Sequence, residues 1–153
     1  MYLNNKDFGD LSAYNVLMVD DVPINLLLVR KMLGLFNFEV RTASDGLKAL
    51  AEVEARKPDL ILLDLMMPGM HGFDVLAHLK ENPATADIRV VILSALNTNE
   101  DIVKGYRLGA ADFITKPIIM EKLVNCVATQ FSLIQASRPG SVTFRVQSKE
   151  IRK

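Results

Sequence analysis

The sequence predicts an α/β domain in which five strands form one parallel sheet and five helices connect them. Three short, continuous apolar runs are typical of strands that are covered on both faces. Segments with the apolar period of a helix separate these runs. Strands that alternate with helices in this way imply right-handed crossover connections and a parallel sheet. The three apolar runs are Val16–Val19, Leu60–Leu63 and Val90–Leu93.

Two weaker strand candidates and five helical patterns complete a series of five β-α units without an internal sequence repeat. The weaker strands are predicted at 38–42 and 112–115. The helices are predicted at 23–35, 44–51, 73–79, 102–108 and 118–135. Pro23 suits a first helical turn, Thr98 is a candidate N-cap, and Gly109 suits the end of the fourth helix.

Length and composition limit the class of protein. A chain of 153 residues suits one domain with short extensions. Its 18 basic and 18 acidic residues cancel, so the charge does not indicate binding to nucleic acid or to an anionic membrane surface. The single cysteine, Cys126, cannot form an internal disulfide. There is no signal-peptide pattern, and no apolar run approaches the roughly twenty residues of a spanning helix. We therefore expect a soluble, cytoplasmic protein.

Polar residues follow four of the predicted strands at the point where each strand ends. Asp20 and Asp21 follow the first strand, Asp64 the third, Ser94 the fourth and Lys116 the fifth. The carboxyl ends of parallel strands share one edge of the sheet, and ligands bind in the crevice at that edge. Each residue alone has an ordinary explanation as a cap, a turn or a solvated charge. Together they predict one site that contains three carboxylates, a hydroxyl and an ammonium group.

This set of groups indicates phosphoryl chemistry. Three crowded carboxylates repel one another unless a cation joins them, and Mg²⁺ (or Mn²⁺) prefers such oxygen ligands. A divalent ion and Lys116 together would stabilise the charge of a phosphoryl group. The sequence contains no glycine-rich lysine loop of the Walker type. Asp64, at the end of a buried run, is the best candidate for a nucleophile that becomes an acyl phosphate.

The same residues resemble the receiver domain of two-component response regulators. The resemblance covers residues 14–135 and rests on the acidic pair at 20–21, Asp64 followed by LMMPGMHG, the Ser94-Ala95 pair and TKP at 115–117. It implies a flavodoxin-like, doubly wound fold with strand order 2-1-3-4-5. It also implies phosphorylation of Asp64 by a histidine kinase or a histidine phosphotransfer protein, with an unknown downstream protein as the target.

The resemblance further implies a metal site. Asp21, Asp64 and the backbone carbonyl of Met66 would bind Mg²⁺, and Asp20 would act largely through water. Met66 and Leu96, each two residues beyond a site residue, would flank the phosphoryl group. Neither side chain can orient an attacking water molecule. We therefore expect slow self-dephosphorylation.

The resemblance also assigns the parts of a switch. Lys116 would neutralise phosphoryl charge, and a cis bond before Pro117 would aim this lysine inward. Ser94 would be the switch hydroxyl, and Phe113 would match the switching aromatic residue. When Ser94 moves to the phosphoryl group, Phe113 would turn into the space it leaves. This motion would change the surface over the fourth helix, the fifth strand and the fifth helix.

The fifth predicted helix carries more apolar residues than one stripe facing a sheet requires. Because the family commonly dimerises through its last elements, we expect a homodimer or partner surface on this helix. The alternative is a helix end that packs beneath its own tail. The residues assigned to the partner surface are Leu123, Val127, Phe131 and Ile134.

The two ends of the chain differ from its middle. Residues 1–13 are expected to form a flexible leader, and residues 136–153 a tail or a truncated linker. The basic residues near the end do not form a DNA-binding motif, so we expect no direct binding to nucleic acid. One alternative is that the chain is a receiver fragment of a larger regulator or hybrid kinase, without its output domain.

A second alternative is a phosphohydrolase of the haloacid dehalogenase type. Such enzymes also use an aspartate nucleophile, Mg²⁺, a hydroxyl and a lysine. They normally carry an acid two residues after the nucleophile to protonate the leaving group, and here that residue is Met66. The acidic pair also comes first in this chain instead of last. The sequence therefore favours a phosphoacceptor domain over an enzyme that acts on other substrates.

Overall fold

The computed structural model describes residues 14–96 and 98–137. The predicted leader at 1–13 and the C-terminal segment from 138 onward lie outside the described residues. The last helix ends at Ser137, two residues beyond the predicted helix end at 135. Among the described residues, no helix is long and apolar enough to cross a membrane.

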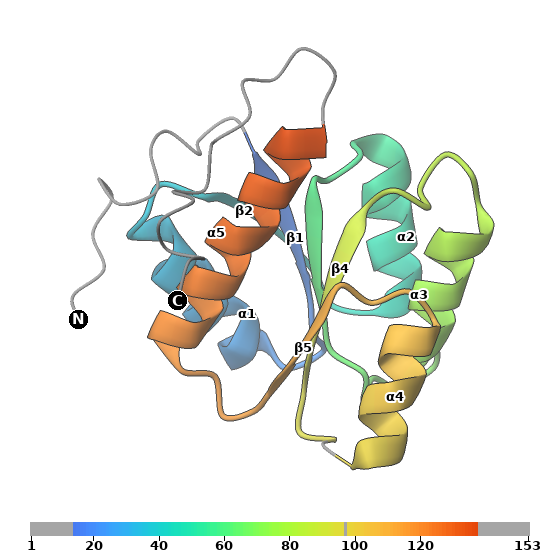
Figure 1. The fold of residues 1–153 in the computed structure, drawn as a ribbon. Coiled ribbons are helices and arrows are strands. Elements are labelled where there is room, and N and C mark those ends of the chain that lie inside the picture. Colours follow the sequence, from blue (N-terminus) through green and yellow to red (C-terminus); the bar gives the residue numbers. More distant parts are fainter. Residues whose placement is uncertain (1–13, 97, 138–153) are drawn as a thin grey trace, which may run out of the picture.

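Five parallel strands form one sheet in the order β2-β1-β3-β4-β5, which confirms the predicted fold. Helices on both faces connect consecutive strands (Figure 1). The strands are β1 (Asn15–Val19), β2 (Glu39–Ala43), β3 (Leu60–Leu63), β4 (Arg89–Ser94) and β5 (Asp112–Thr115). The helices are α1 (Pro23–Gly34), α2 (Gly46–Ala55), α3 (Gly72–Glu81), α4 (Asn99–Arg107) and α5 (Met120–Ser137).

The sheet separates two apolar cores. One core lies under α1 and α5, and the other lies under α2, α3 and α4 (Figure 1). Alternate residues of each central strand enter opposite cores: Leu62 and Val91 belong to the first, and Ile61 and Ile92 to the second. β1 and β3 are buried at every position. Burial on both faces explains why the central strands read as continuous apolar runs.

Local polar groups set the helix ends. Pro23 is the first residue of α1, and the Thr98 side chain accepts a hydrogen bond from the backbone N–H of Asp101 at the start of α4. Gly109 has φ +106°, a conformation that favours glycine, just after α4. These positions confirm three predicted helix signals. α4 begins at Asn99 instead of 102 because its first turn is polar and carries no apolar period.

The prediction of a partner surface on α5 is wrong for the residues that were assigned to it. Leu123, Val127 and Phe131 are fully buried, and Ile134 packs against the same core. The ring of Phe131 stacks on Tyr14 with centroids 4.7 Å apart. The extra apolar residues of α5 therefore pack within the same chain, in part against aromatic residues such as Tyr14.

Candidate functional site

The carboxyl edge of the sheet brings together the charged residues that end β1, β3 and β5. Oxygen atoms from Asp20, Asp21 and Asp64 all lie within 4.8 Å of one another. The ammonium Nζ of Lys116 lies 2.9 Å from Asp20 Oδ2 and 3.6 Å from Asp64 Oδ1. These four side chains come from distant parts of the sequence, and the parallel sheet brings them together because it places the strand ends side by side.

Asp20 is fully buried and is the most firmly held of the three acids. Its Oδ1 accepts a hydrogen bond from the backbone N–H of Val22 at 2.9 Å. Its Oδ2 accepts hydrogen bonds from the side-chain amide of Asn25 at 3.1 Å and from Lys116. Asn25 had no predicted role. Its position on the first turn of α1 places the amide beside the carboxylate.

Asp64 is only 4% exposed and is under net electrostatic strain. Burial raises the pKa of its carboxyl, and the charges of Asp20 and Asp21 raise it further. Lys116 and the backbone N–H of Met66 oppose these effects, but the pKa stays above its ordinary value. The cluster therefore has more negative charge than one ammonium group compensates.

The donor set fits a divalent cation. Among the described residues, Asp20, Asp21 and Asp64 are the one group of three or more possible protein ligands close enough to share an ion. All three ligands are carboxylates, and hard cations such as Mg²⁺ prefer oxygen. A cation would also relieve the repulsion that raises the Asp64 pKa. The acid cluster thus could hold a metal ion.

The predicted switch residues lie on β4 and β5, the two strands that follow β3 in the sheet. Ser94 is fully buried, and its Oγ accepts a hydrogen bond from the backbone N–H of Leu96 at 3.1 Å. The backbone N–H of Lys116 donates to the carbonyl of Ser94 at 2.9 Å. Phe113 is half-buried against the core under α2, α3 and α4. The Lys116–Pro117 peptide bond is cis, as the resemblance implied.

The loop from β3 to α3 returns close to the backbone of Asp64. A Cβ atom on Gly72 would lie 2.4 Å from the carbonyl oxygen of Asp64, so only glycine fits there. His71 caps α3, because its Nδ1 accepts a hydrogen bond from the N–H of Phe73 at 3.0 Å. The backbone N–H of His71 donates in return to Asp74. The sequence pattern does not predict these roles, because each depends on the folded path of the loop.

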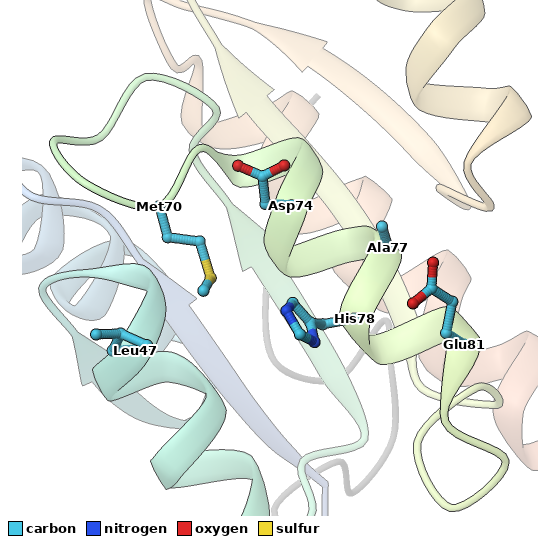
Figure 2. Close-up of a pocket in the computed structure, with 6 residues that line it drawn as sticks. All are labelled: Leu47, Met70, Asp74, Ala77, His78 and Glu81. Atoms are coloured by element: carbon cyan, nitrogen blue, oxygen red, sulfur yellow. The ribbon is translucent and has the colours of Figure 1, made fainter.

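A hollow between α2 and α3 does not overlap the acid cluster. Its volume is about 540 Å³. Figure 2 shows the thioether of Met70 and the ring of His78 directed toward the space between the two helices. None of the predicted site residues lines this hollow, and its acidic residues do not converge on one point. The lining residues are Leu47, Met70, Asp74, Ala77, His78 and Glu81.

An apolar surface lies on the other side of the cluster, along α1. Ile24, Leu27 and Leu28 are each about half exposed, which is unusual for three neighbouring large apolar side chains. Leu28 also lines a cavity of about 460 Å³ that includes Asn25 and Lys116. The apolar surface is therefore continuous with the charged site.

Comparison with known proteins agrees with this geometry. Residues 16–128 match the sequence model of the response regulator receiver domain. The chain is 48% identical over 103 residues to Response regulator PleD of Caulobacter vibrioides, an alignment that covers 67% of the chain but 23% of PleD. It is 34% identical over 112 residues to Protein PilH of Pseudomonas aeruginosa, covering 73% of the chain and 93% of PilH. The chain thus spans about a quarter of PleD and most of PilH.

Solved structures show the same fold. The chemotaxis protein CheY4 of Vibrio cholerae aligns with a TM-score of 0.72 and 28% identity, over 76% of this chain and 97% of CheY4. A chain of the CheX-CheY-BeF3-Mg²⁺ complex from Borrelia burgdorferi aligns with a TM-score of 0.73 and 29% identity, over 77% of this chain and 89% of that one.

Proposed function

The chain belongs to the response regulator receiver domain family, and we propose that it is a signalling switch in which Asp64 accepts a phosphoryl group from a phosphohistidine. The donor would be a histidine kinase or a histidine phosphotransfer protein. The observation that carries this proposal is the buried, electron-rich carboxylate of Asp64 within 3.6 Å of the Lys116 ammonium. Few structural roles would require an acid to be placed there without full compensation of its charge.

In the transfer step, an Oδ atom of Asp64 attacks phosphorus. An O–P bond forms, the bond between phosphorus and the imidazole nitrogen breaks, and the electron pair of that bond returns to the imidazole. Lys116 supplies a fixed positive charge beside the reacting group, and Asp20 holds this lysine in place. The product is an aspartyl phosphate.

The residues that would hold Mg²⁺ (or Mn²⁺) are Asp21, Asp64 and the backbone carbonyl of Met66, with Asp20 acting largely through water. When bound, the ion would add positive charge to the phosphoryl oxygens. Met66 is 57% exposed and Leu96 is half-buried. Because neither of these apolar side chains can orient a water molecule, we infer slow hydrolysis of the acyl phosphate.

The response to phosphorylation would begin at Ser94. Its hydroxyl would exchange the N–H of Leu96 for a phosphoryl oxygen, and Phe113 would turn toward the space that it leaves. Reversing a population from 1:99 to 99:1 takes about 5.5 kcal/mol. Hydrogen bonds to a charged group contribute about 1.5–3 kcal/mol each, so two or three new contacts are sufficient. The surface of α4, β5 and α5 would carry the signal to a downstream protein.

The apolar surface of α1 supports a protein donor. Asp64 is 4% exposed, so a donor must cover the mouth of the site to bring a phosphohistidine close to it. The adjacent surface is formed by Ile24, Leu27 and Leu28, and Leu28 shares a cavity with Lys116. We infer that the donor buries this surface, which a small phosphodonor would not need.

The direct test is incubation with Mg²⁺ and acetyl phosphate, followed by intact mass measurement. We expect one phosphoryl adduct on the unaltered chain and none on Asp64→Asn. Asp87→Asn is the matched control, because Asp87 is an exposed acid that pairs with Lys57 away from the cluster. An adduct of equal yield on Asp64→Asn would contradict the proposal. Multiple-turnover release of phosphate from small phosphoesters would instead support the dehalogenase-type alternative.

A further inference from the structure

The contact between α4 and β5 is built around a glycine. Gly105 is the buried residue of α4 and faces the sheet. A Cβ atom at this position would lie 2.8 Å from Cδ1 of Ile92 and 3.4 Å from Cδ2 of Phe113. Ile92 is fully buried, so its end methyl group cannot turn away without displacing the core. Glycine within a helix costs about 0.5–1 kcal/mol relative to alanine, so the residue that allows this close approach lowers the intrinsic stability of α4.

Next to this glycine, a hydrogen bond joins the same two elements. The hydroxyl of Tyr106 on α4 donates to Oδ1 of Asp112 at 3.1 Å. Oδ1 also accepts the backbone N–H of Phe113 at 2.7 Å. On the other side, the thiol of Cys126 on α5 lies 3.4 Å from Oδ2. One carboxylate therefore links α4, β5 and α5 at the residue that precedes the switching aromatic side chain.

The thiol of Cys126 and the hydroxyl of Tyr106 both have raised pKa values. Burial and the Asp112 charge raise the pKa of the Cys126 thiol to about 12. Burial and the same carboxylate also raise the pKa of Tyr106 above its ordinary value. Both groups therefore keep their protons at neutral pH and remain available as donors to the carboxylate.

The Gly105 contact lies on the same face of the sheet as Ser94, whereas Asp112 alternates to the opposite face, where Cys126 of α5 lies. Ile92 and Phe113 are partners in the register of β4 and β5, and Ser94 is paired with Thr115 two residues further along. Residues two apart on a strand face the same side of the sheet. Ile92, Ser94 and Phe113 thus share the face that α4 covers, so a rotation of the Phe113 ring must be accommodated by α4.

We propose that Gly105 and the Tyr106–Asp112 hydrogen bond form a latch that holds α4 against β5 in the unphosphorylated protein and so keeps Phe113 in its resting position. The inference rests on the proposed function and concerns how the same site is regulated. Gly105, Tyr106 and Asp112 are positioning residues, since none of them touches the acid cluster.

The latch predicts a gain of affinity when it is weakened. If the resting position of α4 is disfavoured, the competent state becomes more populated and the apparent dissociation constant for a phosphoryl mimic falls in proportion. Loss of one hydrogen bond corresponds to about a fivefold change in such a population. A variant that merely damages the fold would lose affinity, so the direction of the change separates the two explanations.

The test measures the affinity for beryllofluoride in the presence of Mg²⁺ and the NMR signals of the Phe113 ring. Gly105→Ala and Tyr106→Phe should each bind beryllofluoride about fivefold more tightly than the unaltered chain. Without ligand, their Phe113 signals should move toward the bound positions. Gly34→Ala is the matched control, because Gly34 ends α1 and a Cβ atom there meets nothing within 4 Å.

A double-mutant cycle makes the test independent of packing at Gly105. If Tyr106 acts through Asp112, then Asp112→Ala combined with Tyr106→Phe should change the affinity no more than Asp112→Ala alone. Unchanged or weaker beryllofluoride binding by both Gly105→Ala and Tyr106→Phe would overturn the latch. If the unaltered chain accepts phosphate on Asp64, this failure leaves the proposed function intact. If the unaltered chain binds no beryllofluoride and gains no phosphoryl adduct, both proposals fail.

Discussion

The two edges of the sheet carry similar numbers of charged groups but use them in opposite ways. Near the amino edge, Arg56 donates to both oxygens of Glu39 at 2.7 and 3.1 Å, and Arg41 lies 3.5 Å from Glu52. The pKa of Glu39 is lowered, chiefly by its hydrogen bond with Arg56. At the carboxyl edge, three carboxylates lie close together, and the ammonium of Lys116 pairs with two of them, Asp20 and Asp64.

The difference shows which edge is structural and which is reactive. At the amino edge, Glu39 is paired with Arg56, and its pKa is lowered as a result. The carboxyl edge keeps an excess of negative charge at low exposure, and the pKa of Asp64 is raised as a result. A cluster in this condition gains stability from any cation that enters it, which is the property that a metal-dependent site needs.

The largest expected difference between the edges follows removal of one cation from each. Lys116→Met leaves Asp20 and Asp64 buried without their ammonium partner, so the free energy of unfolding should fall by about 3 kcal/mol when no divalent ion is present. Arg56→Met should have a much smaller effect, because that ion pair is half exposed. Urea unfolding in the presence of a chelator measures both. Equal losses of unfolding free energy in Lys116→Met and Arg56→Met would contradict the proposed difference between the two edges.

A slightly smaller effect is expected from adding the ion. Mg²⁺ at about a hundred times its dissociation constant should stabilise the folded chain by about 2.7 kcal/mol. The stabilisation should disappear in Asp21→Asn and persist in Glu39→Gln, since only Asp21 belongs to the acid cluster. Thermal unfolding over a series of Mg²⁺ concentrations tests this. If Mg²⁺ raised the unfolding temperature of Asp21→Asn as much as that of the unaltered chain, the ion would have to bind outside the acid cluster.

A change of about tenfold is expected at the proposed donor surface. Leu28→Asp should slow phosphorylation by a protein phosphodonor about tenfold, as for loss of a well-buried interface contact. It should leave phosphorylation by acetyl phosphate unchanged. Leu133→Asp is the matched control, because Leu133 is 47% exposed and Leu28 is 46% exposed, but Leu133 lies far along α5. Equal slowing with both donors would show damage to the site instead of to a docking surface.

The smallest expected effect is a pH dependence of opposite sign at the two edges. Because the pKa of Asp64 is raised in the folded state, its ionisation costs stability above that pKa, and the cost disappears as the pH falls through it. Asp64→Asn should therefore be more stable than the unaltered chain at neutral pH, with a gap that closes on acidification.

Glu39 should behave in the reverse way. Its lowered pKa gives stability above the ordinary glutamate range, and this stability is lost as the pH falls through the folded-state pKa. Glu39→Gln should thus be the less stable form at neutral pH. Unfolding curves measured in chelator at several pH values compare each variant with the unaltered chain. If both substitutions raised stability at neutral pH, or both lowered it, the proposed difference between the two edges would be contradicted.

Much of the site could be predicted because its charged residues follow predicted strands, although the strand before Lys116 has the weaker pattern and Asn25 lies on a helix. The apolar runs before Asp20 and Asp64 are unambiguous, since strands buried on both faces tolerate few polar residues. Once the strands are parallel, their ends must meet at one edge. The proximity of Lys116 to both acids follows from topology more than from any local signal.

The errors lie where burial depends on neighbours that are distant in sequence. The apolar excess on α5 predicted a partner surface, but Phe131 stacks on Tyr14 and meets Phe38 at 5.4 Å between centroids. An apolar stripe has the same pattern whether it faces another chain or its own core. The pattern alone cannot distinguish them, because periodicity reports which residues avoid water and not what covers them.

By itself, the sequence determined the fold class, the order of the strand ends and the chemical groups available at them. Apolar periodicity and the order of residues along the chain can be read without knowing any tertiary contact. Only the tertiary structure decided that Lys116 lies nearer to Asp20 than to Asp64, and that Gly105 admits the ring of Phe113 against α4. The position of Lys116 and the fit at Gly105 depend on distances of a few ångströms between separate helices and strands. Close packing of the whole core sets these distances.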